Sequence, residues 1–107
     1  MTPTSRSLKW LRENGWDACV VEKFNIYAKV RQDAFGYGDI LACHPLRGIA
    51  LVQTTSTGNM SARRKKIAGI PQSARWMKCG GMVIIHGWAK RGPRGKAKRW
   101  TLSEEIL

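Results

Sequence analysis

Acidic residues are scarce in this sequence, and the shortage limits the partners that the chain can bind. Its 107 residues contain 7 Asp and Glu against 19 Lys and Arg, a formal net charge of +12, and no acid lies between Asp39 and Glu104. A field of this sign attracts polyanions, and nucleic acid is the commonest polyanionic partner of a basic domain. The charge has two other interpretations, a structural role in a nucleoprotein particle and simple solubility.

Long apolar runs and paired cysteines are also missing. No run approaches the ~18 residues of a membrane span, and no signal-peptide segment is recognisable at the N-terminus, so we expect a cytoplasmic protein. Cys19, Cys43 and Cys79 stand singly, without the spacing of a zinc site or the even number of a disulfide framework. We therefore expect all three to be small core residues.

The first half of the chain is predicted to contain one helix and up to four strands. An apolar content of 43% is typical of a folded protein, and the length suits a single domain over residues 1–107. Thr4 or Ser5 is the predicted N-cap of a helix that ends at Gly15. The predicted strands are 16–24, a short one within 26–31, and a hairpin of 39–44 and 48–55.

The second half is predicted to contain two helices and a second hairpin. Ser61 is the predicted cap of a helix that Gly69 ends, and Pro71 fits the first turn of another helix. Strands follow at 82–90 and 97–103. The order α-β-β-β-α-(α)-β-β indicates a small α/β or α+β sheet domain.

Residues 33–55 are the most informative segment. Asp39 opens one strand of the predicted hairpin, and Gln53 stands near the end of the other. Paired strands bring these oxygen-bearing side chains together, and Mg²⁺ typically takes one or two carboxylates in proteins. We therefore expect a site for Mg²⁺ or Mn²⁺. The alternatives are that Asp39 only caps a turn and that Gln53-Thr54-Thr55 is only a strand end.

Five short segments occur in an order that is similar to a known family. They are V-V-E-K at 20–23, R-Q-D-A-F-G-Y-G-D-I-L-A at 31–42, L-V-Q-T-T-S at 51–56, N-M-S-A-R at 59–63 and H-G-W-A-K at 86–90. Together they resemble the PD-(D/E)XK nuclease superfamily, and within it the small Holliday-junction-resolvase-like and phage-encoded members. The resemblance implies a restriction-endonuclease-like fold, a central mixed sheet flanked by helices. It also implies a metal-dependent endonuclease acting on structured or double-stranded DNA, including Holliday junctions, and a homodimer in the junction-resolving case.

The resemblance assigns roles to particular residues. Asp39 takes the place of the first metal-binding acid, Gln53 that of the motif Glu, and Thr55 that of the motif Lys. Gln53 can bind metal through its amide oxygen without contributing charge, whereas Thr55 supplies no ammonium group. The alternative function is therefore a catalytically impaired nucleic-acid-binding module of the same fold.

Other side chains can compensate for the altered motif. Glu22 would add a second carboxylate to the metal, or it forms a salt bridge at the sheet edge. Lys23, Lys29 or Lys66 would supply the missing ammonium group. Asp33 is expected to be a hydrogen-bonding loop residue and not a ligand.

Two basic segments are expected to contact nucleic acid. One is the first turn of the helix at 61–69, which begins close after the Q-T-T strand, and the other is the hairpin loop 91–98; in both, a solvated surface is the alternative. The residues expected to bind nucleic acid are Arg31, Asn59, Ser61, Arg63, Arg64, Lys65, Lys66, Arg91, Arg94, Lys96 and Lys98. Trp10, Trp88 or the strand 82–88 would form the dimer interface, and His86 is expected to be structural.

Overall fold

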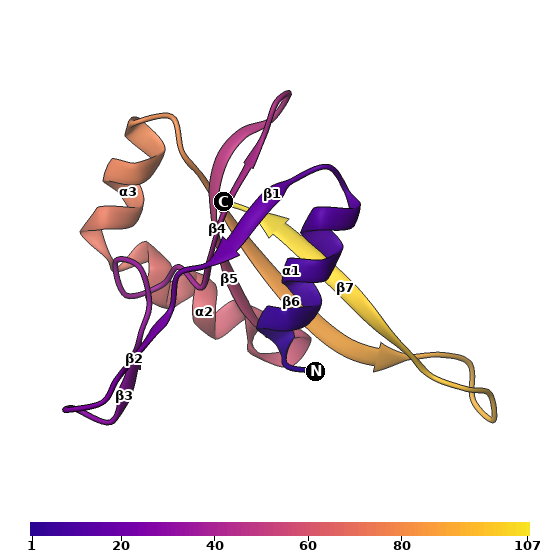
Figure 1. The fold of residues 1–107 in the computed structure, drawn as a ribbon. Helices are drawn as coiled ribbons and strands as arrows, with labels where there is room; N and C mark the ends of the chain where they lie inside the picture. Colours follow the sequence, from indigo (N-terminus) through magenta and orange to yellow (C-terminus); the bar gives the residue numbers. More distant parts are fainter.

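A five-stranded mixed sheet forms the centre of the computed structural model, which describes residues 1–107 (Figure 1). Across the sheet its strands are β1 (Asp17–Val20), β4 (Ile40–His44), β5 (Gly48–Ser56), β6 (Met82–Arg91) and β7 (Arg99–Ile106). Only β5 and β6 are parallel, and the other neighbours are antiparallel. The parallel pair needs a crossover connection, which the two consecutive helices between these strands supply.

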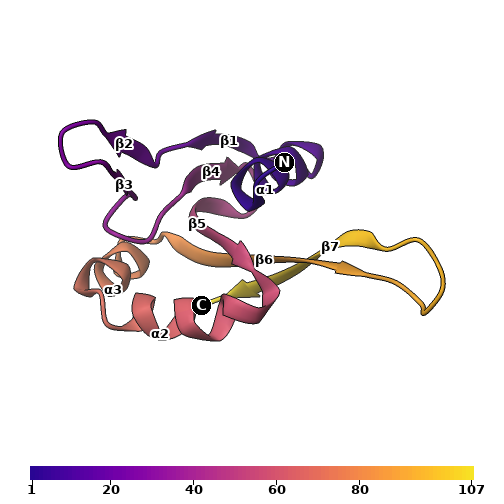
Figure 2. The ribbon, with the colours of Figure 1, turned by 90° about the horizontal axis from the view of Figure 1, so that it is seen from below.

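Helices lie on both faces of the sheet (Figure 2). Helix α1 (Pro3–Glu13) packs against β1 and β5 on one face. The 3₁₀ turn η1 (Thr57–Asn59), α2 (Met60–Ala68) and α3 (Pro71–Lys78) lie on the other face, against β5 and β6. The chain is therefore an α+β protein with a sheet between two helical layers.

Each face has its own apolar core. On the α1 face the buried residues are Leu11, Trp16, Ile40, Ala42, Ala50, Val52 and Ile84. On the α2 and α3 face they are Tyr37, Leu51, Ile67, Val83 and Ile85. Side chains of a strand alternate between faces, so β5 sends Val52 towards α1 and Leu51 towards α2. The same alternation directs Gln53 towards the α2 side and Thr54 towards α1.

The predicted N-caps of the first two helices are wrong. Thr2 caps α1, since its side chain accepts a hydrogen bond from Ser5 N while the Ser5 hydroxyl accepts one from Thr2 N. Pro3 fits the first helical position because its missing N–H would have no partner there. Ser61 lies inside α2, whose cap residue Asn59 forms no capping hydrogen bond. The predicted end of α1 at Gly15 and the start of α3 at Pro71 are confirmed.

The predicted strand 16–24 is interrupted. It leaves the main sheet after Val20, because the backbone N–H groups of Val21 and Glu22 both point at the carbonyl of Asp39. The chain then forms a separate hairpin of β2 (Lys23–Asn25) and β3 (Val30–Gln32). The two hairpins predicted around 39–55 and 82–103 are present as β4–β5 and β6–β7, the last strand extending to Ile106.

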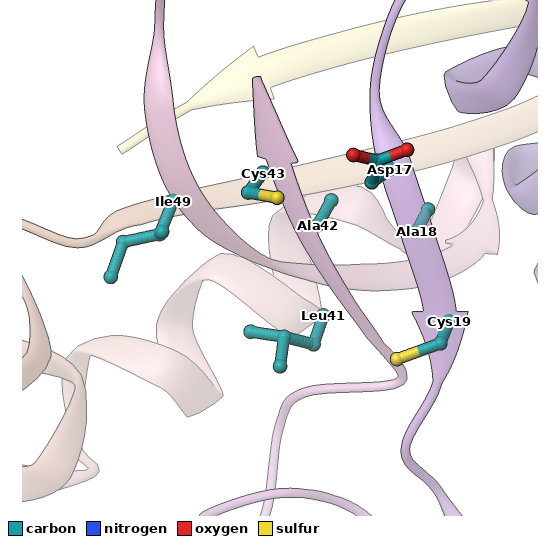
Figure 3. A pocket seen from close by; sticks show the side chains of 7 residues that line it. All are labelled: Asp17, Ala18, Cys19, Leu41, Ala42, Cys43 and Ile49. Atoms are coloured by element: carbon teal, nitrogen blue, oxygen red, sulfur yellow. The ribbon is translucent and has the colours of Figure 1, made fainter. Parts of the chain in front are cut away.

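The expectation that the cysteines lie in the core is wrong, since all three are exposed. Cys19 and Cys43 lie on β1 and β4, on the side of the sheet that α2 and α3 cover only over β5 and β6. They line a shallow hollow of about 390 Å³ together with apolar neighbours such as Leu41 and Ile49 (Figure 3). β1 and β4 lie outside the reach of α2 and α3, which leaves these thiols accessible on that side of the sheet.

The strand expected to form a dimer interface is enclosed within the subunit. β6 lies between β5 and β7, and Trp88 is buried. Trp10 is half-buried and packs edge-on against His86, with ring centroids 5.3 Å apart. Trp88 and the middle of β6 therefore offer no exposed surface to a second subunit. None of the helices combines the length and apolar character needed to cross a membrane.

A candidate metal centre at the start of β4

Asp39 immediately precedes β4 and faces the end of β5. The pairing of Ile40 with Val52 sets this position, and Asp39 N donates to Val52 O at 2.9 Å. Its carboxylate is buried, with 4% of the residue exposed. One oxygen, Oδ2, accepts three hydrogen bonds, from Gln53 Nε2 (2.8 Å), Thr54 N (2.7 Å) and Thr54 Oγ1 (3.1 Å). None of these bonds involves Oδ1, which leaves that oxygen to other ligands.

Two further carboxylates lie beside Asp39. One oxygen each of Glu22, Asp33 and Asp39 lies within 4.8 Å of the others. Glu22 is brought there by the break between β1 and β2, where its N–H points at the Asp39 carbonyl. Three acids from residues 22–39 thus form one cluster, the carboxylate cluster.

Asp33 joins the cluster because of the loop between it and Asp39. Ala34 and Gly38 exchange two hydrogen bonds of 2.8 Å, so the loop closes on itself and its flanking residues lie close together. Gly38 permits this closure, since a Cβ there would lie 3.2 Å from that of Ala34 and 3.0 Å from the Leu51 side chain. The sequence interpretation of Asp33 as a loop residue missed this role. The available signal was two glycines between two aspartates.

The electrostatics of the cluster favour a bound proton or cation. Burial is the largest cause that raises the pKa of Asp39, to about 7, and the nearby Asp33 carboxylate raises it further against the opposing hydrogen bond from Thr54 N. Like charges at this separation disfavour simultaneous ionisation. A divalent cation would offset both the desolvation and the repulsion, and so favour the ionised form of Asp39.

Gln53 contributes an oxygen without a partner. The residue is 4% exposed, its Nε2 donates to Asp39, and its buried Oε1 has no hydrogen-bond partner. A buried acceptor left unpaired costs about 1–3 kcal/mol. Carboxylate and amide oxygens are the ligands that Mg²⁺ and Mn²⁺ prefer. The residues present therefore fit a hard divalent cation.

The cluster lies in an open cleft of about 310 Å³. Its lining residues are Pro3, Thr4, Glu22, Arg31, Asp33, Asp39, Gln53, Thr54 and Arg63. Thr4 Oγ1 lies 2.8 Å from Thr54 Oγ1 and so ties the start of α1 to the site. Apart from Pro3 the lining residues are polar, and the charged ones are three acids and two arginines.

The positive groups at the cleft are not the expected lysines. Arg31 forms a 2.8 Å ion pair with Glu22, and Arg63 reaches the cleft from the first turn of α2. Lys23 follows Glu22 directly, so strand alternation directs it away from the cleft, and it is exposed. Lys29, Lys66 and Thr55 do not line the cleft either, and Thr55 is buried in β5.

The remaining residues expected to bind nucleic acid lie outside the cleft. The loop joining β6 and β7 projects from the body of the protein (Figures 1 and 2) and exposes Arg91, Arg94, Lys96 and Lys98. The other positions lie on or next to α2. Ser61, Lys65 and Lys66 are exposed, Arg64 pairs with Glu105 at 2.8 Å, and Asn59 donates to Ser56 Oγ.

A second polar cluster is centred on two buried residues, Ser7 and His86. His86 has Ser7 Oγ 2.9 Å from Nδ1 and Glu104 Oε2 2.8 Å from Nε2, and Trp88 Nε1 donates to the same Ser7 oxygen. The His86 hydrogen bond lowers the pKa of Glu104. Ser7 and His86 are fully buried and Glu104 closes the row at the surface, so this row of serine, histidine and acid holds α1 to β6 and β7, and its serine and histidine are closed to a substrate.

No protein-family model, curated protein or solved structure matches the chain. The class that fold and site define is an α+β protein with a carboxylate-lined cleft suited to a divalent cation.

Proposed function

We propose that the chain is a divalent-metal-dependent endonuclease that hydrolyses phosphodiesters of structured or double-stranded DNA, with Holliday junctions among its substrates. The observation that carries the proposal is the carboxylate cluster in its basic setting. Glu22, Asp33 and Asp39 gather beside an unpaired amide oxygen, in a chain of net charge +12. A cation site surrounded by positive surface suits a polyanionic substrate.

The order of elements supports a restriction-endonuclease-like fold. Helix α1 is followed by the antiparallel strands β1, β4 and β5, then by α2, and then by β6 parallel to β5. Asp39 and Gln53 occupy adjacent strands at the positions that the resemblance assigns to the first acid and the motif Glu. In this assignment the β2–β3 hairpin, α3 and β7 are additions to the shared core.

Four residues of the cleft would bind the metal ion in the proposed reaction. Asp39, Glu22 and Asp33 would hold Mg²⁺ or Mn²⁺, and the free Oε1 of Gln53 would complete the protein ligands. The metal supplies a Lewis acid that neutralises phosphate charge and lowers the pKa of bound water.

Arg31 and Arg63 line the same cleft and are placed to stabilise the negative charge that develops on the phosphate. Guanidinium groups donate in a planar fork that matches phosphate oxygens. We assign to Arg63 the role of the missing motif lysine, because it is the only cation that α2 contributes to the cleft.

Substrate selection would depend on backbone shape more than on base sequence. The exposed basic residues of the β6–β7 loop and of α2 suit phosphate contacts, which position a protein on DNA without reading its bases. A homodimer is the assembly that symmetrical cutting of a junction would require.

The decisive experiment is a plasmid-nicking assay in Mg²⁺ or Mn²⁺. Wild-type protein should convert supercoiled plasmid to open circles, and Asp39→Asn should abolish nicking while retaining DNA binding. Asp17→Asn is the matched control, because Asp17 is an exposed acid on β1 outside the cleft. Cutting by Asp39→Asn at the wild-type rate would overturn the assignment.

The second candidate function is a nucleic-acid-binding module that keeps the fold without catalysis. The observation that favours it is Thr55 at the motif lysine position, with no lysine lining the cleft. DNA binding by the wild type without nicking in either metal would select this function.

A further inference from the structure

The β2–β3 hairpin exposes an unusual amount of apolar surface. Its two strands pair only with each other. Phe24 is 61% exposed, Tyr27 at its tip is 96% exposed, and Ile26 and Val30 are also exposed. Isolated surface apolar residues need no explanation, but several gathered on one small projection indicate a binding surface.

One face of this hairpin belongs to the carboxylate cleft. Phe24 is two residues from Glu22 and pairs across the strands with Arg31, so the three side chains share a face. The 2.8 Å ion pair between Arg31 and Glu22 confirms this arrangement. Asp33, two residues beyond Arg31, continues the same face into the carboxylate cluster. Phe24 therefore lies on the hairpin face that leads to the cluster, outside the lining of the cleft, while Val30 lies on the opposite face, paired with Asn25.

The charges around Phe24 indicate a polyanionic partner. Residues 23–32 contain Lys23, Lys29 and Arg31 and no acid. A second copy of the chain would bring another charge of +12 to this surface, which opposes self-association there. An exposed aromatic ring on a segment of net positive charge is the combination that binds bases and backbone of unpaired nucleic acid.

We propose that the cleft face of the β2–β3 hairpin is a base-stacking platform. Phe24 stacks on a base displaced from the helix, next to the phosphate that a cation bound at the carboxylate cluster would hold, and Tyr27 contacts a base farther along the strand. Bases inside a perfect duplex are already stacked and cannot be reached in this way. The preferred substrate is therefore DNA with unpaired bases, at a branch, a bubble or a single strand. The position of the phosphate rests on the proposed function.

The test compares binding to two DNAs by fluorescence anisotropy at constant salt, with Ca²⁺ in place of Mg²⁺ and Mn²⁺ as an oxygen-binding cation at the cluster. One is a perfect duplex, and the other is the same duplex with a central unpaired segment carrying 2-aminopurine. Wild-type protein should prefer the second DNA. Phe24→Ala should weaken that binding by about 5- to 150-fold, the range for one stacked base, with little effect on the duplex. Phe24→Tyr should restore the preference, and stacking should change the 2-aminopurine fluorescence only when residue 24 is aromatic.

Val30→Ala is the matched control, because it removes apolar surface from the opposite face of the same hairpin. Thermal melting of each variant verifies that it is folded. Three outcomes would refute the base-stacking proposal. They are an equal loss of affinity for both DNAs in Phe24→Ala, equal effects of Phe24→Ala and Val30→Ala, and no preference of the wild type for the DNA with unpaired bases. A wild-type dimer that Phe24→Ala dissociates in sedimentation would also refute it, since a second subunit would then cover Phe24. Wild type that nicks plasmid but shows no preference refutes the platform alone, whereas wild type that binds neither DNA refutes the proposed function as well.

Discussion

Removing the charge of Asp39 should stabilise the metal-free protein at alkaline pH. The carboxylate is buried beside two other acids and has no cation of its own to pair with, since Arg31 is bonded to Glu22. Asp39→Asn keeps the shape of the side chain and an oxygen that can accept from Thr54 N. The substitution therefore tests the electrostatic strain at the site with little change in packing.

The size of the effect follows from the pKa of Asp39, which is raised from its ordinary value of 3.8 to about 7. The folded protein binds this proton more tightly than the unfolded chain does. The proton's contribution to the free energy of unfolding is therefore fully present below about pH 4 and is lost as the pH rises through 7. At 1.36 kcal/mol per pKa unit, the loss is about 4 kcal/mol in alkaline buffer. Each 1 kcal/mol shifts Tm by roughly 4–8 °C in a domain of this size. We expect Asp39→Asn to raise Tm by roughly 15 °C or more near pH 8 and to leave it nearly unchanged near pH 3.

The assay is thermal unfolding followed by circular dichroism at both pH values, in EDTA and then in Mn²⁺. Mn²⁺ should raise the Tm of the wild type near pH 8 and leave that of Asp39→Asn unchanged, because the ion stabilises only the folded state that binds it. Asp17→Asn controls for loss of a surface acid and should respond like the wild type. A stability difference between Asp39→Asn and wild type that is the same at both pH values, or a less stable variant near pH 8, would refute this reasoning.

Three further predictions concern the surface, the metal ligands and the core. The logarithm of the DNA-binding constant should fall with the logarithm of salt concentration at a slope of roughly −4 to −5. Arg63→Ala combined with Lys66→Ala should make this slope less steep by roughly one to two units. A salt-independent affinity measured by anisotropy would contradict the electrostatic argument. Gln53→Glu should tighten Mn²⁺ binding, measured by calorimetry, and should destabilise the metal-free protein near neutral pH. The reason is that the substitution replaces the N–H donor to Asp39 with a fourth carboxylate. Unchanged Mn²⁺ affinity would show that Gln53 is not a metal ligand. Ser7→Ala should lower the free energy of unfolding, measured in urea, by roughly 2–4 kcal/mol. The substitution leaves the buried Trp88 N–H without its acceptor and the facing His86 nitrogen without its partner. An effect below about 1 kcal/mol would show that water or a rearrangement replaces these hydrogen bonds.

Local patterns in the sequence determined much of the framework of this protein. Local sequence patterns, namely apolar runs, glycine and proline, predicted the β4–β5 hairpin, the end of α1 at Gly15 and the start of α3 at Pro71. All three predictions are confirmed. The net charge and the position of Asp39 at the head of a strand are likewise properties of the sequence alone. Such features depend on backbone conformations and periodicities that a few neighbouring residues set.

Tertiary structure decided which acids and cations meet. The break after Val20 depends on hydrogen bonds to the Asp39 carbonyl, 18 residues away from Val21 in sequence, and only this break delivers Glu22 to the cleft. Asp33 reaches the cluster through a loop that closes by its own pairing. Arg63 lines the cleft, and none of the expected lysines does, because of where α2 begins, which no local pattern predicted correctly.

Burial at the sheet edge was likewise decided by the fold. Cys19 and Cys43 lie in apolar stretches that are typical of a core, yet they are exposed because α2 and α3 cover only β5 and β6. A strand's own sequence indicates which residues share a face, but the reach of helices from elsewhere in the chain determines whether that face is covered. The carboxylate cluster and the exposed face of Phe24 depend on long-range placement of the same kind.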